Sequence, residues 1–287
     1  MVDNRQNNSE HTTDCLSGKL IPVRRRVNVQ VSYHTGHTPG IVFLHGGLGN
    51  RFNWRSQYEF FLSQGREVLA YDLAGHGQSS PYQKYSIGRH HRDLTRLLRR
   101  YQIKVPILCC HSYGVPIGLE WARRHQVSAL ILIAGGTHDL APWWEIPLIK
   151  FLAWGGKYLF YLPGVQTLSN RLSSDRSKEK LERFFAESPV PTEPHPYKAL
   201  EIFWGYNFWH CDNSKGTLRD RNDRKLFIPV LVISGGQDPM FTKEMAAELA
   251  NSFKYGQHFH LPEAGHLLLA EYPEQVNQKI AGFIAGI

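Results

Sequence analysis

The chain has 287 residues, of which 42% are hydrophobic and 20% are charged, as in an ordinary folded globular protein. This length allows one large α/β domain with an inserted piece. No apolar run reaches the roughly 18 residues of a membrane-spanning helix. The polar start, MVDNRQNNSEHTTDCLSGKL, lacks the layout of a signal peptide. The chain has four cysteines without an evident pairing partner, at positions Cys15, Cys109, Cys110 and Cys211. We therefore predict a reduced, cytoplasmic protein.

The formal net charge is +8, and the basic residues are clustered. Clusters occur at Arg24–Arg26, in GRHHRDLTRLLRR (88–100) and in RDRNDRK (219–225). The second cluster fits the polar side of an amphipathic helix, so solvated surface is the interpretation that we favour. The alternative is attraction of acidic lipids, phosphate-bearing substrates or nucleic acid. No nucleic-acid-binding motif accompanies the clusters, and we expect no nucleic-acid partner.

Apolar runs alternate with amphipathic segments along the chain. Strands are predicted within residues 40–47, 66–72, 105–112, 127–136, 228–238 and 257–266, and helices within 53–65, 88–102, 115–125, 242–253 and 273–287. Continuous apolar strands that alternate with helices are typical of a parallel sheet with both faces covered. Ligands bind such sheets beyond the carboxyl ends of the strands.

Three residues that can form a catalytic relay stand at those strand ends. Ser112 ends the strand VPILCCHS, Asp238 follows VLVISGGQ, and His266 follows the last predicted strand. A serine hydroxyl is a poor nucleophile at neutral pH and needs a base to take its proton. We expect His266 to be that base, and Asp238 to fix its tautomer and to stabilise its imidazolium form.

The turn around the serine reads CCHSYG, close to the Gly-x-Ser-x-Gly pattern of a nucleophile elbow. Cys110 stands where that pattern has its first glycine, and Gly114 keeps the second. We interpret Cys110 as a tolerated small substitution; the alternative is a degenerate, inactive elbow. Neither Cys109 nor Cys110 lies at the apex of the turn, so a cysteine nucleophile is disfavoured.

The motifs HGGLGN, DLAGHGQSS, HSYGV, GGQDPMF and EAGHLLLAEYPEQV resemble those of the α/β-hydrolase superfamily, in its abhydrolase-type esterase/lipase branch. The chain order Ser, Asp, His is that of the superfamily. The resemblance implies oxyanion-hole donors at the backbone N–H groups of Gly47 and Tyr113. It also implies an α/β-hydrolase fold with a polar tail over 1–24, a core over 25–137 and 221–287, and a helical cap over 138–220.

Several other polar residues lie close to these motifs in the sequence, and we expect different roles for them. Asp139 follows an earlier strand and is a rival acid, although Asp238 has the better context. His111 and His45 are expected to be structural, and Asp72 and His76 to hold a turn.

No cofactor or metal is predicted. The histidine pairs His90–His91 and His258/His260 lack carboxylate or cysteine partners at metal-site spacing. The segment HGGLG has neither the P-loop lysine nor the longer dinucleotide-binding pattern.

Aromatic residues are concentrated between 143 and 210. They either pack a cap on the core, line an apolar pocket or touch a membrane surface. The prediction is therefore a serine hydrolase that cleaves an ester of a hydrophobic acid. The alternatives are carbon–carbon bond hydrolysis, thioester hydrolysis, cofactor-free haloperoxidase-like chemistry and, with less support, a non-catalytic binding module. The sequence does not fix the oligomeric state.

Overall fold

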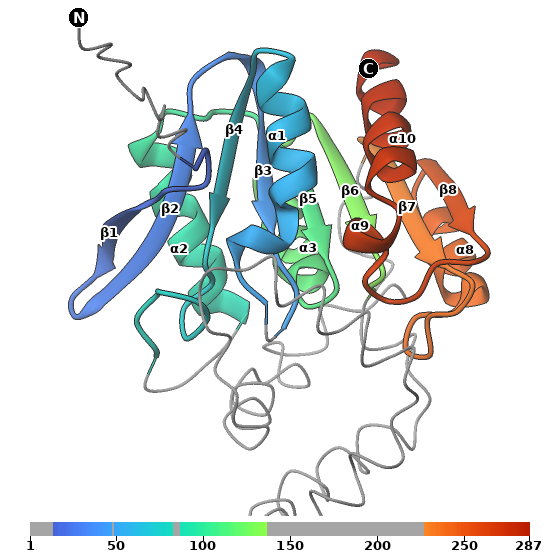
Figure 1. Cartoon of the computed structure of the whole chain (residues 1–287), viewed down its shortest axis with the longest axis horizontal. Helices are drawn as coiled ribbons and strands as arrows, with labels where there is room; N and C mark the ends of the chain where they lie inside the picture. Colours follow the sequence, from blue (N-terminus) through green and yellow to red (C-terminus); the bar gives the residue numbers. More distant parts are fainter. Residues whose placement is uncertain (1–13, 48, 83–86, 137–226) are drawn as a thin grey trace, which may run out of the picture.

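A computed structural model describes residues 14–47, 49–82, 87–136 and 227–287 (Figure 1). Within these ranges the centre is an eight-stranded sheet with the order β1-β2-β4-β3-β5-β6-β7-β8. The strands are β1 Lys19–Arg24, β2 Val27–His34, β3 His37–Leu44, β4 Arg66–Tyr71, β5 Ile107–His111, β6 Ala129–Ile133, β7 Pro229–Gly235 and β8 Tyr255–Leu261. From β4 to β8 all neighbouring strands are parallel, so their carboxyl ends lie at one edge.

Helices cover both faces of the sheet, and Figure 1 shows α1, α9 and α10 in front of it. Their bounds are α1 Arg55–Ser63, α2 Ile87–Arg100, α3 Gly114–Ala122, α8 Lys243–Asn251, α9 Leu268–Glu271 and α10 Pro273–Ala285, with a 3-10 turn η1 at Arg51–Trp54. Two apolar cores result because side chains alternate along each strand. Val42 and Leu44 face the core of α2, α3 and α8, whereas Ile41 and Phe43 face the core of α1, α9 and α10. The predicted sheet with helices on both faces is confirmed.

The start of the sheet corrects the sequence analysis. β1 pairs with β2, and β2 with β4, all antiparallel. The predicted polar tail over 1–24 is therefore wrong at its C-terminal end, because Lys19–Arg24 form a strand and Leu16 is already buried. The edge strand was not predicted because it is short and contains Pro22, and a proline within a run argues against a strand.

β6 and β7 are hydrogen-bonded neighbours, with Leu130 opposite Val230 and Ile133 opposite Ile233. The long segment that joins them, with the predicted cap over 138–220, lies outside the described residues. In the described part, no helix is both long enough and apolar enough to span a bilayer.

Candidate active site

Ser112 lies in a sharp turn between β5 and α3. Its φ is +49°, in the left-handed region that few side chains adopt. Its N–H donates to the Ile133 carbonyl at 2.9 Å, and its carbonyl accepts from the Val115 N–H at 2.9 Å. A Cβ at Gly114 would lie 2.5 Å from the Leu44 carbonyl oxygen, so the turn brings α3 close to β3 and needs a glycine there. This geometry is that of a strained strand-to-helix elbow that presents the serine.

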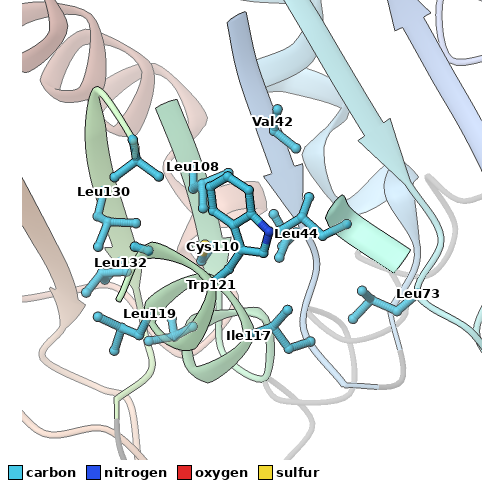
Figure 2. Packing of buried hydrophobic residues seen from close by; sticks show 14 of the residues in the cluster. Val42, Leu44, Leu73, Leu108, Cys110, Ile117, Leu119, Trp121, Leu130 and Leu132 are labelled. Atoms are coloured by element: carbon cyan, nitrogen blue, oxygen red, sulfur yellow. The ribbon is translucent and has the colours of Figure 1, made fainter. Parts of the chain in front are cut away.

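Cys110 fits this elbow because a second glycine makes room for it. A Cβ at Gly118, one turn into α3, would overlap the Cys110 Sγ. Figure 2 shows Cys110 in the apolar cluster that also contains Leu119 and Leu132. Burial raises the pKa of this thiol, and that of Cys109, above the ordinary value. Both cysteines are therefore packed thiols rather than nucleophiles.

The three predicted relay residues meet. The Ser112 Oγ lies 3.0 Å from the His266 Nε2, and the His266 Nδ1 lies 2.8 Å from the Asp238 Oδ2. The other carboxylate oxygen of Asp238 accepts from the N–H groups of Met240 and Phe241, at 2.8 and 3.1 Å. The Asp238 side chain is fully buried, and that of His266 is 19% exposed. The carboxylate is thus fixed from two sides, and the imidazole remains accessible to a substrate.

Two contacts hold the loop that carries His266, and the sequence pattern indicated neither of them. The Gly265 N–H donates to Glu271 at the end of α9, at 2.7 Å. The Gln237 N–H, beside the acid, donates to the Ala264 carbonyl at 2.8 Å. These hydrogen bonds tie the loop after β8 to the loop after β7 and to α9, which helps to fix the distance between Asp238 and His266.

His111 provides a third support for this loop, as the expected structural role implies. Its Nε2 lies 2.9 Å from the His266 carbonyl oxygen and must carry the proton, because a carbonyl only accepts. Its Nδ1 has no hydrogen-bond partner among the described residues, and burial lowers the pKa of the ring to about 3. His111 is therefore a neutral clamp on the base and has no contact with the serine hydroxyl.

The glycine loop after β3 passes next to the serine. A Cβ at Gly46 would lie 3.0 Å from the Ser112 Cβ. The His45 side chain holds this loop in place. Its Nε2 accepts a hydrogen bond from the Leu73 N–H at 2.9 Å, so the ring proton must be on Nδ1. The Nδ1–H donates to the Gly46 carbonyl at 2.7 Å. Gly47, the predicted oxyanion donor, is the next residue of this turn.

Asp72 holds the adjoining turn, as predicted from the sequence. It accepts from the Arg51 N–H at 2.8 Å, from the Arg51 guanidinium at 2.7 Å and from the Gln78 N–H at 2.9 Å. Arg51 and Asp72 are both buried, and a buried ion pair is stable only when its remaining hydrogen-bonding groups are also satisfied. This pair ties the residues after the glycine loop to the end of β4.

Two predictions about the site fall outside the described residues: the rival acid Asp139 and the aromatic cap. Within the described ranges, no three metal-ligating side chains gather at one point. The prediction of no metal and no cofactor stays a prediction.

Comparison with known proteins assigns the family. The model of the α/β hydrolase fold matches residues 39–273, so the chain belongs to the α/β hydrolase fold family. The human protein ABHD8 is 28% identical over 254 residues, which cover 85% of this chain and 54% of ABHD8. The chain thus spans about half the length of the ABHD8 proteins that it matches. The uncharacterised hydrolase YugF of Bacillus subtilis is 26% identical and is covered to 98% of its length, against 92% of this chain.

Solved structures share the fold. An esterase from Exiguobacterium antarcticum superposes with a TM-score of 0.71 at 17% identity, over 93% of this chain and 99% of the esterase. Other structures with this fold include an enol-lactonase and bromoperoxidases. At such identities the likeness establishes the fold alone. The family and its hydrolase-named relatives support an enzyme, and the reaction must be argued from the site.

Proposed function

We propose that the protein is a serine hydrolase that cleaves a carboxylic ester through an acyl-enzyme intermediate. The observation that carries this proposal is the unbroken chain of hydrogen-bonding distances from Ser112 through His266 to Asp238, at a serine held in a strained elbow. A structural serine needs neither the strained turn nor a histidine whose second nitrogen is bound by a buried carboxylate.

In the first half-reaction the Ser112 Oγ attacks the ester carbonyl carbon, and the His266 Nε2 takes the hydroxyl proton. Asp238 keeps the proton of the imidazole on Nδ1 and stabilises the imidazolium. The bond between the carbonyl carbon and the leaving oxygen then breaks, and His266 returns its proton to the departing alcohol. In the second half-reaction water takes the place of the alcohol and releases the acid and the free serine.

The negative oxygen of each tetrahedral intermediate needs donors that are in place beforehand. We assign this role to the N–H groups of Tyr113 and Gly47. The support for Gly47 is its loop, which passes beside the Ser112 Cβ and is fixed by His45. Loss of one such donor typically costs about 100- to 1000-fold in rate.

A hydrophobic acyl group is the proposed substrate feature. Its support is the aromatic content of residues 143–210 in the sequence, next to strands whose carboxyl ends carry the relay. Cleavage of thioesters or carbon–carbon bonds would use the same serine, so the relay alone does not separate these reactions.

The test is covalent labelling. A fluorophosphonate should modify wild-type protein at Ser112, identified by mass spectrometry of the labelled peptide, and Ser112→Ala should abolish labelling. Ser234→Ala is the matched control, because the buried Ser234 Oγ also contacts imidazoles, His258 at 2.8 Å and His260 at 3.0 Å, but lies outside the relay. That variant should label as well as wild type when signals are normalised to folded protein. Labelling at a cysteine, or none in folded wild type, would refute a serine hydrolase.

A further inference from the structure

We propose that one face of α2, with the adjoining β1–β2 turn, binds the surface of an anionic lipid bilayer. This arginine face consists of Arg89, Arg92, Arg96, Arg99 and Arg100 on α2 and of Arg25 and Arg26 in the turn. This face is separate from the relay, and lipid binding there does not require the proposed hydrolysis.

The helical arginines form one stripe. Steps of three and four residues separate Arg89, Arg92, Arg96 and Arg99, which is the spacing of side chains on one side of an α-helix. From Arg92 onward these arginines are exposed, whereas Leu94, Leu97 and Leu98 on the opposite side are buried. The stripe extends over about 15 Å at the rise of an α-helix.

The turn extends the stripe sideways. Arg24 bonds Asp93 of α2 at 2.7 Å through its Nε, and it also donates to the Arg89 carbonyl at 2.5 Å. The exposed residues Arg25 and Arg26 follow it directly and are therefore held beside the helix.

The face is almost uncompensated. Eight arginines, counting Arg24, stand against the single carboxylate of Asp93, whose side chain is 2% exposed and already bonded to Arg24. Arg96 approaches the same carboxylate at 3.6 Å. Among the described residues, Arg92, Arg99 and Arg100 have no carboxylate within ion-pair distance. This face has an excess of seven positive charges, which is nearly as large as the net charge of +8 of the whole chain.

Helix stability does not explain this arrangement. Basic side chains in the last turn, Arg99 and Arg100, favour a helix, but Arg89 in the first turn opposes the helix dipole, and no acidic residue stands there. The pairs Arg92/Arg96 and Arg96/Arg100 place like charges four residues apart, which destabilises a helix by a few tenths of a kcal/mol each. A polyanionic partner would offset these costs.

The chemistry of the face favours lipid phosphate. All five basic residues of α2 are arginines, whose planar guanidinium can bind two phosphate oxygens at once. The described residues of β1, β2 and α2 include no exposed aromatic side chain on which a nucleic-acid base could stack. α2 also packs on β1 and α3 and lies flat against the domain. A row of cations flush with the protein surface matches a plane of phosphates.

Only the buried side of the first turn of α2 approaches the candidate active site. The His90 ring, between Arg89 and Arg92 in the sequence, lies 5.8 Å from the Tyr113 ring, next to Ser112.

The test is co-sedimentation with vesicles at about 0.1 M salt, where charges separated by up to about 10 Å still interact. Wild type should bind vesicles of phosphatidylcholine with phosphatidylglycerol, and pure phosphatidylcholine far more weakly. Each arginine contributes about five-fold, so the triple variant Arg92→Gln, Arg96→Gln, Arg99→Gln should bind about 100-fold more weakly. The unfolding temperature should be equal to that of wild type or slightly higher, because two pairs of like charges are removed, and hydrolysis of a water-soluble ester should match wild type.

The matched control removes the same charge elsewhere. Lys243→Gln, Lys254→Gln and Lys279→Gln change residues near β7 and β8, at the end of the strand order away from β1 and β2. This triple variant should bind vesicles within a few-fold of wild type. If both triple variants lost vesicle binding equally, binding would depend on net charge rather than on the arginine face, and the proposal would be wrong. The proposal would also be overturned if wild type did not bind the anionic vesicles. A duplex or single-stranded oligonucleotide that binds more tightly than the vesicles, and loses binding in the arginine variant, would also overturn it.

Discussion

Ser112 and His266 are 154 positions apart in the chain, yet their side chains lie within hydrogen-bonding distance. The contact is possible because both residues follow parallel strands whose carboxyl ends share one edge of the sheet. Asp238 reaches the same place after β7, and its second oxygen is held by two N–H groups of its own turn. The relay therefore depends on backbone turns rather than on flexible side chains.

Among single residues, Asp238 offers the most direct test of the proposed relay. Asp238→Asn keeps the shape of the side chain but replaces one carboxylate oxygen by an amide donor, so that the tautomer of His266 is no longer fixed. Turnover of an ester should fall by about 10,000-fold, as measured by steady-state kinetics.

Asp139→Asn is the comparison for that experiment, because Asp139 is the rival acid in the sequence. Its turnover should stay within a few-fold of wild type. A collapse of activity in Asp139→Asn, with Asp238→Asn nearly unaffected, would place the acid after β6 instead.

Sequence patterns predicted Ser112, Asp238 and His266 because each ends an apolar strand in a recognisable turn. They could not predict the clamp from His111 to the His266 carbonyl, which joins residues 155 positions apart and needs only one imidazole. Nor did they identify Gly118 as the partner of Cys110. That partnership depends on the turn from β5 into α3, and the Gly-x-Ser-x-Gly pattern does not extend to residue 118.

Among the elements, the junction of β5 and α3 has a strict packing requirement. Gly114→Ala would place a methyl group 2.5 Å from the Leu44 carbonyl oxygen and 3.0 Å from that of His45. Both are backbone atoms and cannot rotate away, so the elbow must shift. Urea unfolding should show a loss of about 1–3 kcal/mol, and ester turnover should fall with it.

Gly282→Ala on α10 is the matched control. A Cβ at Gly282 meets nothing within 4 Å, and the residue is exposed inside a helix. The variant should be about 0.5–1 kcal/mol more stable than wild type and equally active. If both alanine variants lost stability alike, the close approach at Gly114 would not be the cause.

The element pattern was predictable where burial is complete. β5 and β6 are buried at every residue, and their apolar runs identified them. β1 is short and contains Pro22, and the alternation of apolar and polar residues in β2 was not recognised as a strand pattern. The four-residue α9 is too short for a helical period. Pairing of strands and their register come from tertiary packing, which local patterns do not contain.

For the whole molecule, buried histidines make the fold sensitive to acid. Burial lowers the pKa of His45, of His76 and of His111 to about 3, against about 6.5 in an unfolded chain. Below pH 6.5 the unfolded state binds protons that the folded state does not, so the free energy of unfolding falls with pH until about pH 3. Each ring contributes up to about 1.4 kcal/mol per pH unit. Urea unfolding should therefore show little change from pH 8 to 7 and a steep loss from 6 to 5.

The variant His111→Gln tests whether buried neutral histidines cause the loss of stability in acid. Glutamine can still donate to the His266 carbonyl but has no titrating ring. The loss between pH 6 and 5 should become smaller by up to about 1.4 kcal/mol. A free energy of unfolding that is constant from pH 8 to 5 in wild type would contradict the assignment of neutral buried imidazoles.

Substrate preference is also a property of the whole molecule, because the proposed substrate would contact both residues 138–220 and the relay. If aromatic side chains there bind the acyl group, kcat/KM for p-nitrophenyl esters should rise from acetate to at least a medium chain. Each buried methylene contributes about 0.8 kcal/mol, close to a four-fold gain. A profile that falls steadily from acetate onward would exclude a hydrophobic acyl substrate.

The ladder between β6 and β7 joins two parts of the chain that residues 134–228 separate. Ser112 lies before this separation, and Asp238 and His266 lie after it. A chain cut within 137–226 yields one fragment with Ser112 and one with Asp238 and His266, each with one unpaired strand edge. The proposed hydrolysis would then require the two fragments to associate and to rebuild the ladder. The fold is thus suited to a split-enzyme reporter, in which catalysis measures the association of two polypeptides.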